Sequence, residues 1–237
     1  MLEAFFFFMN NIYIEEFRWN DRNYKIALGI SDENNNFESL HDIEKKELNE
    51  NTYDKERSNA YINSRILAKE AAHKIGLTTN IDDFHIEKGI LGQPLLKGIN
   101  HDYQISISHS KNIATILLYP SELLMGIDIE QQRDDLPKLI KNELSTQEKY
   151  SIEKHAFPSR KALEIWTAKE ALAKTIKTGL SISSVTLETK NKGYRQYTYP
   201  HATTFKAITH HLQQNYCLCI CMPNINHLNI FNNNISQ

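Results

Sequence analysis

The chain has few cysteines, no marked excess of either charge and no long apolar run. Its three cysteines, Cys217, Cys219 and Cys221, fall in one short segment of the 237 residues. This excludes a spread disulfide framework and fits a reducing compartment. The formal net charge is -2, so bulk charge gives no indication of binding to nucleic acid or to a membrane surface.

One short apolar run, Phe5 to Phe8, stands near the N-terminus. No basic residue precedes it, and Asn10 and Glu15 follow soon after. The run is too short to span a bilayer and lacks the layout of a signal peptide. We interpret it as a buried first strand or an ordered arm. The expectation is a cytoplasmic protein that binds neither membrane nor nucleic acid.

Apolar residues make up 41% of the chain, enough for a core in one large domain or two small ones. In the first half, residues 31–52 predict a loop with a short helix, and residues 54–75 predict a helix that ends at Gly76. Strands are expected over 84–88, 103–108 and 113–118, and Ser110 to Asn112 predict a hairpin between the last two.

The second half repeats this order of elements. A strand is expected over 123–130, followed by helical stretches over 136–155 and 159–177 and by strands near 184–189, 203–209 and 215–222. Two halves with the same order predict an α+β fold with a boundary between residues 1–120 and residues 121–237.

Within this second half, Gly126-Ile127-Asp128-Ile129-Glu130 alternates in the way that a strand does. Alternation places Asp128 and Glu130 on one face and the two isoleucines on the other. Taken alone, this pattern favours solvated charges at the end of a strand over a functional site.

Forty residues later, the segment WTAKEALAK predicts a helix with Trp166, Glu170 and Lys174 along one stripe, at i, i+4 and i+8. Brought next to residues 126–130, this stripe would gather three carboxylates and an ammonium. Such a group suits a magnesium ion that also holds a phosphate-bearing ligand. Trp166 is expected to serve core packing and not to contact a ligand. The alternative for Lys174 is a surface lysine paired with Glu170.

In order and spacing, these pieces resemble the 4'-phosphopantetheinyl transferases, in particular the larger, single-chain type that acts on synthetases of siderophores, peptides and polyketides. The matching pieces are RSNAYINSR at 57–65, GQP at 92–94, ISISHS at 105–110, GIDIE at 126–130 and WTAKEALAK at 166–174, with Gly179-Leu180 after them. The resemblance covers roughly residues 57–180. It implies a pseudo-duplicated fold, in which each half packs helices on a small antiparallel sheet.

The resemblance also implies a reaction: transfer of the 4'-phosphopantetheine arm of coenzyme A to a serine of an apo acyl or peptidyl carrier protein. The serine hydroxyl attacks the β-phosphate and 3',5'-ADP leaves, so catalysis depends on positioning and charge stabilisation. Coenzyme A and a carrier protein are the expected partners, magnesium is the expected cofactor, and a monomer is expected. Carrier helices in this family are typically acidic, so a basic or apolar patch is expected at a place that the sequence does not give.

Two other functions compete with this interpretation. A non-catalytic paralogue that binds a carrier protein or coenzyme A would be expected if a metal ligand or Lys174 were missing, and none is. A magnesium-dependent phosphohydrolase usually needs a second carboxylate cluster, which the sequence does not show.

On this resemblance, Asp128, Glu130 and Glu170 are the expected magnesium ligands. Glu170 has a second expected role as the base that takes the proton of the serine, although metal ligation would lower its basicity. Lys174 is expected at the α-phosphate of coenzyme A, where it would stabilise the departing oxygen. Lys169 lies about 100° away on the helix and is expected to be a surface or partner-facing charge.

The expected coenzyme A ligands lie in the first half. Ser108 and His109 precede a turn, where a hydroxyl, an imidazole and turn amides can hold a phosphate, and the resemblance assigns the 3'-phosphate to this place. Arg57 suits phosphate because its donors work in pairs, and Lys88 is expected near the adenine. Solvated helix arginines are the alternative for Arg57 and Arg65.

Two departures from the family pattern concern turns. Gln93 stands where the family has a lysine, which removes one phosphate contact, and Lys177 stands where the family has a glycine. The three alternating cysteines predict a buried strand face and not a metal site, because no CxxC motif or nearby histidine pattern accompanies them.

Overall fold

A computed structural model describes residues 11–19, 21–32, 36–90, 92–99, 102–177, 186–190, 194–198, 204–212 and 215–224. The chain divides into two compact units, residues 1–122 and residues 123–237. The interpretations of Phe5 to Phe8 and of Gly179-Leu180 concern residues outside these ranges. Along the described ranges, no helix has the length and apolarity needed to cross a membrane.

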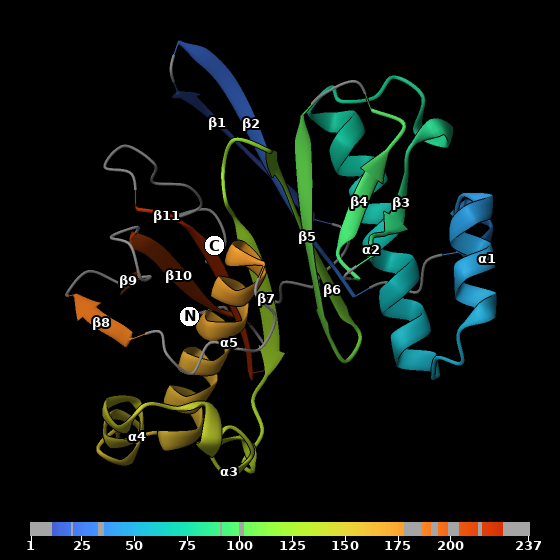
Figure 1. The fold of residues 1–237 in the computed structure, drawn as a ribbon. Helices are drawn as coiled ribbons and strands as arrows, with labels where there is room; N and C mark the ends of the chain where they lie inside the picture. Colours follow the sequence, from blue (N-terminus) through green and yellow to red (C-terminus); the bar gives the residue numbers. More distant parts are fainter. Residues whose placement is uncertain are drawn as a thin grey trace, which may run out of the picture. The chain divides into compact units, whose positions relative to one another are not determined.

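The first unit is built on a four-stranded antiparallel sheet in the order β1-β2-β6-β5 (Figure 1). Its strands are β1 (Asn11–Trp19), β2 (Arg22–Ser31), β5 (Tyr103–Ser110) and β6 (Ile113–Pro120). A separate two-stranded ribbon consists of β3 (His85–Lys88) and β4 (Pro94–Lys97). The helices are α1 (Asp42–Glu50) and α2 (Lys55–Lys74), with short 3-10 turns at Phe37–Ser39 and Ile81–Asp83.

Helix α2 packs on this sheet through a row of fully buried side chains. Leu67, Ala68 and Ala71 join the sheet residues Ile116 and Leu118 in one apolar cluster. Burying a leucine or isoleucine contributes about 1.5–3 kcal/mol each, so this face fixes the helix on the sheet. The predicted helix over 54–75 and the predicted hairpin of β5 and β6 are confirmed.

The hairpin of β1 and β2 has no counterpart in the sequence-based prediction. Within the described residues, two strands therefore precede the first helix of this unit. Strand β2 is buried without interruption from Ile26 to Ser31, so it lacks the alternation that marks a half-exposed strand. A continuous apolar run of this kind does not distinguish a buried strand from a buried helix.

The second unit has a five-stranded antiparallel sheet in the order β7-β11-β10-β9-β8. Its strands are β7 (Gly126–Gln131), β8 (Thr186–Lys190), β9 (Tyr194–Thr198), β10 (Thr204–Leu212) and β11 (Tyr216–Pro223). Its helices are α3 (Leu136–Leu139), α4 (Thr146–Glu153) and α5 (Pro158–Ile176), with a 3-10 turn at Lys141–Glu143. The mixed α+β class with small antiparallel sheets is confirmed, whereas internal duplication stays a prediction.

Two details of the second unit were not predicted. The helical stretch over 136–155 is two short helices, because Ser145 starts α4 with a capping box that includes Glu148. Strand β9 was missed altogether.

Helix α5 covers the sheet face that carries the acidic residues of β7. In the register of β7 and β11, Cys217 lies opposite Glu130 and Cys219 lies opposite Asp128, and directly opposed residues share a face. Cys219 and Cys221 pack against alanine and leucine side chains of α5. The predicted buried cysteine face is therefore confirmed, and it is the face that looks toward α5.

A glycine lets β7 approach α5 closely at the start of the strand. A Cβ atom at Gly126 would overlap the carbonyl oxygen of Ala171 and would lie 2.7 Å from the backbone nitrogen of Thr175. Because backbone atoms cannot move aside, only glycine fits here. This contact fixes the position along α5 at which Asp128, two residues further on, meets the helix.

Candidate active site

The site in the second unit is centred on the carboxylate of Asp128. Its side chain is only 5% exposed, and Lys174 Nζ donates a hydrogen bond of 2.8 Å to its Oδ1. Lys174 lies in the last turn of α5 and stays 30% exposed. The ammonium is therefore held by Asp128 on one side while it remains accessible to a ligand on the other.

Glu170 lies one turn before Lys174 and is half-buried. The pKa of Glu170 is raised to about 7, mainly by burial and then by the charges of Asp128, Glu130 and Glu143, against the opposing effect of Lys174. The predicted stripe of α5 and the acidic face of β7 are thus brought together. Glu143, in the 3-10 turn before α4, was not predicted, since no periodic pattern in the sequence marks it.

This group of carboxylates has the right chemistry for magnesium but does not form a closed cage. Among the described residues, no three His, Cys, Asp or Glu side chains are gathered as a ligand set. Magnesium commonly takes one or two carboxylates and completes its shell with phosphate oxygens and water. Asp128 and Glu170 fit that partial donor set, because a bound cation would offset both the burial and the repulsion by Asp128 that raise the pKa of Glu170. The complete triad with Glu130 stays a prediction.

The prediction for Lys169 is wrong. Its side chain is 3% exposed, and its Nζ donates to both carboxylate oxygens of Glu148, at 3.2 Å and 3.1 Å. The Lys169 side chain does lie about 100° around the helix from the Glu170 stripe, but on that side it faces α4 and not solvent. Lys169 therefore ties α5 to α4, and Trp166 packs against the neighbouring apolar cluster as predicted.

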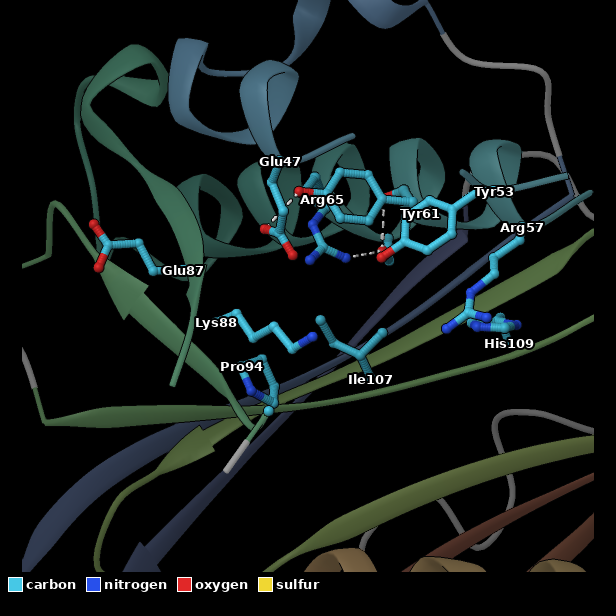
Figure 2. Close-up of a pocket in the computed structure, with 12 residues that line it drawn as sticks. Glu47, Tyr53, Arg57, Tyr61, Arg65, Glu87, Lys88, Pro94, Ile107 and His109 are labelled. Atoms are coloured by element: carbon cyan, nitrogen blue, oxygen red, sulfur yellow. Dashed lines mark hydrogen bonds between the residues drawn. The ribbon is translucent and has the colours of Figure 1, made fainter. Parts of the chain in front are cut away.

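The first unit contains a cavity of about 290 Å³ that collects most of the predicted coenzyme A ligands. Figure 2 shows Arg57 and His109 on one side of it and Lys88 and Arg65 further along. The complete lining consists of Glu47, Tyr53, Arg57, Tyr61, Ser64, Arg65, Glu87, Lys88, Gly92, Pro94, Ile107 and His109. Residues from α1, α2, β3, β4 and β5 thus meet around one hollow, in which the cations Arg57, Arg65 and Lys88 outnumber the carboxylates Glu47 and Glu87.

Two arginines of this cavity lie on tyrosine rings. The guanidinium carbon of Arg57 lies 4.7 Å from the centroid of Tyr53, and that of Arg65 lies 3.6 Å from the centroid of Tyr61. Tyr61 in turn donates a hydrogen bond of 2.9 Å to Glu47. The tyrosines were not predicted, although the spacing of four residues between each tyrosine and the next arginine was visible in the sequence.

Ser108 lies on the opposite face of β5 from Ile107 and His109. Ile107 and His109 line the cavity, whereas Ser108 is buried and lies opposite Thr115 in the sheet. Alternation along a strand separates a residue from its two neighbours in this way. Gln93 packs against Gly89 and is not among the lining residues, and the phosphate role of Ser108 stays a prediction.

Comparison with known proteins adds one finding. Residues 124–221 match the family model of the 4'-phosphopantetheinyl transferase superfamily. A search of curated proteins found none that matches the chain. The matched range contains β7, α5, β10 and most of β11, and with them Asp128, Glu130, Glu170 and Lys174. It does not extend to the basic cavity of the first unit.

Proposed function

We propose that this protein transfers the 4'-phosphopantetheine arm of coenzyme A to a serine of an apo carrier protein and releases 3',5'-ADP. The observation that carries the proposal is the contact of Lys174 with Asp128, beside the half-buried Glu170, inside the range that matches the superfamily. A cytoplasmic location, a monomeric state and the larger, single-chain type of enzyme are part of the same proposal.

Glu170 is the group that can take the proton of the attacking serine. A general base works best when its pKa lies near the working pH, and burial raises the pKa of Glu170 to about 7. Half-burial leaves one side of the carboxylate open to the incoming hydroxyl. Glu170 would thus accept the proton as the oxygen–phosphorus bond forms.

Lys174 and Asp128 act on the phosphate side of the reaction. The Nζ of Lys174 is fixed by its hydrogen bond to Asp128 and can donate its other hydrogens to phosphate oxygens. A donor held in place before the reaction needs no reorganisation as charge develops on the leaving group. Asp128 is therefore a positioning residue for Lys174.

Magnesium is the cofactor that this proposal includes. Asp128 and Glu170, with Glu130 as the third candidate, would hold it. When bound, magnesium would neutralise the negative charge that develops on the pyrophosphate during the reaction.

The basic cavity of the first unit is the proposed place for the nucleotide end of coenzyme A. Arg57 and His109 offer donors for the 3'-phosphate, and Lys88 adds a positive group close to the expected adenine position. Tyr53 holds the guanidinium of Arg57 in place and so limits its loss of side-chain freedom on binding.

The experiment is intact-mass spectrometry of apo carrier proteins incubated with coenzyme A, magnesium and this protein. A siderophore-type peptidyl carrier and a fatty-acid acyl carrier serve as substrates, with Glu170→Ala as the inactive variant and Glu153→Ala as its exposed control. A gain of about 340 Da that requires Glu170 and is lost with a chelator supports the proposal. If coenzyme A binds and no carrier gains mass, the protein is a non-catalytic paralogue and the proposed transferase function is wrong.

A further inference from the structure

Two carboxylates line the cavity of the first unit, and they have different partners. Glu87 Oε2 lies 3.7 Å from Lys97 Nζ, and its Oε1 lies 3.2 Å from His85 Nε2. Glu47, on α1, instead accepts a hydrogen bond of 2.9 Å at its Oε2 from the hydroxyl of Tyr61. Among the described residues, Glu47 forms no ion pair and its Oε1 accepts no hydrogen bond. Glu47 therefore has an acceptor oxygen open to a ligand of the cavity.

The hydroxyl of Tyr61 holds the Glu47 side chain in place. Burial raises the pKa of Tyr61, so the hydroxyl keeps its proton and stays a donor. The same hydroxyl lies 3.3 Å from the backbone carbonyl oxygen of Glu44, one turn before Glu47 on α1. The carboxylate of Glu47 is thus positioned before a ligand arrives, which lowers the entropic cost of binding.

Arg65 lies on the same tyrosine ring and supplies donors beside this acceptor. Its guanidinium carbon lies 3.6 Å from the ring centroid of Tyr61, and its Nη1 donates a hydrogen bond of 3.0 Å to Ser64 Oγ. Its Nε is buried and has no hydrogen-bond partner in the part of the chain that the structure describes. A buried N–H group without an acceptor is destabilising, and an acceptor atom of a ligand would remove that cost.

An acceptor beside a donor is complementary to one edge of an adenine ring. Adenine presents its 6-amino group next to a ring nitrogen that accepts, whereas a 6-oxo purine has an acceptor in place of the amino group. The other donor at the nucleotide end of coenzyme A is the ribose 2'-hydroxyl, which is adjacent to the 3'-phosphate.

The position of Glu47 favours the base over the ribose. Figure 2 shows Glu47 well away from Arg57 and His109, the proposed donors to the 3'-phosphate. Arg57 and Arg65 lie about 12 Å apart along α2. A nucleotide with its 3'-phosphate at Arg57 would therefore extend its base, and not its 2'-hydroxyl, toward Glu47.

We propose that Glu47 and Arg65 recognise the adenine ring of coenzyme A. Glu47 accepts a hydrogen bond from the 6-amino group, and Arg65 donates one to the neighbouring ring nitrogen. This inference rests on the proposed function, because it takes coenzyme A as the ligand of the cavity. The contact selects adenine over hypoxanthine, since a 6-oxo group would face the carboxylate of Glu47 with no proton between them.

The test is direct binding of 3',5'-ADP and of inosine 3',5'-bisphosphate to the full chain, measured by titration calorimetry. We expect the wild type to bind the adenine nucleotide about 10–100-fold more tightly. In Glu47→Gln the amide can turn to donate to a 6-oxo group, so the preference should fall to about threefold or less. The control Glu50→Gln makes the same change at an exposed carboxylate of α1 outside the cavity lining and should keep the wild-type preference.

A second variant and thermal unfolding separate recognition from misfolding. Tyr61→Phe removes the hydroxyl that holds Glu47 and should also lower the preference for adenine. Equal binding of both nucleotides by the wild type, or no binding of 3',5'-ADP, overturns the inference. A Glu47→Gln variant that loses the same factor for both nucleotides also overturns it, because Glu47 then acts through its charge alone. These measurements need no transfer, so a preference for adenine without modification of any carrier would overturn the proposed function alone.

Discussion

Lys174 Nζ lies 2.8 Å from Asp128 Oδ1 and so connects the last turn of α5 to the middle of β7. The sequence left open a pairing of Lys174 with Glu170 on its own helix. The contact with Asp128 instead joins two segments that are 46 residues apart, and it leaves Glu170 beside the pair as a carboxylate whose pKa is raised to about 7.

Replacing Lys174 with methionine should reduce both activity and stability. We expect kcat for arm transfer to fall about 100-fold, since a preorganised donor to the phosphate is lost. The free energy of unfolding should fall by about 1–3 kcal/mol, because the buried carboxylate of Asp128 loses its charged partner. Urea denaturation of Lys174→Met, Asp128→Asn and the double variant measures the coupling; strictly additive losses would show that the two groups do not interact.

Glu170 should make the stability of the magnesium-free protein depend on pH. Its carboxyl loses its proton near 4.5 in the unfolded chain but near 7 in the folded protein. The folded state therefore binds more protons between these values, and stability decreases as the pH rises through this window. With discounting for solvent screening, Glu170→Gln should be about 1–2 kcal/mol more stable than the wild type at pH 8 and equal to it near pH 4.

Thermal or urea unfolding at both pH values, in the presence of a chelator, checks this expectation. The exposed Glu153 provides the control, since Glu153→Gln should leave the pH profile as it is. A wild-type stability that is flat between pH 5 and pH 8 would contradict the raised pKa.

The buried pair of Lys169 and Glu148 should be important for stability and not for chemistry. Both side chains are 3% exposed, so Lys169→Met leaves an uncompensated buried carboxylate and should cost about 3–5 kcal/mol. Lys46→Met, at an exposed pair on α1, should change stability by at most about 0.5 kcal/mol. Urea denaturation measures both variants, and equal effects would show that the buried pair contributes no more than a surface pair.

The close approach at Gly126 predicts a large effect of one methyl group. Gly126→Ala should destabilise the protein by about 2–4 kcal/mol, because the added Cβ meets backbone atoms of α5. Gly76→Ala is the comparison: it meets no atom within 4 Å but has a φ of +81° and should cost about 1 kcal/mol. The midpoints of thermal unfolding decide between them, and the expectation fails if Gly126→Ala is the milder variant.

The basic cavity predicts discrimination between coenzyme A and its 3'-dephospho form. Arg57→Ala and His109→Ala should each raise the KM for coenzyme A about tenfold, because a charge-assisted contact to phosphate is lost. The KM for dephospho-coenzyme A should change little, and Lys74→Ala, at an exposed lysine in the last turn of α2 outside the cavity lining, serves as the control. Equal changes for both nucleotides would place the 3'-phosphate elsewhere.

Much of the local structure follows from sequence patterns. Alternation over residues 126–130 predicts which side chains of β7 share a face, and helical spacing predicts the stripe of Glu170 and Lys174 on α5. The capping residue Asp54 and the glycine after α2 fix the limits of that helix. Strand β2 was missed because its continuously buried part carries no period.

The sequence alone determined the chemical identity of the candidate site: three carboxylates and a lysine, on a strand and a helix that each present them on one face. The tertiary structure alone decided that Lys174 contacts Asp128, that Lys169 is buried against Glu148, and that two arginines of α2 and a histidine of β5 share one cavity. The physical reason is that local periodicity fixes the direction of a side chain within its own element. What lies in that direction depends on how distant segments pack against one another.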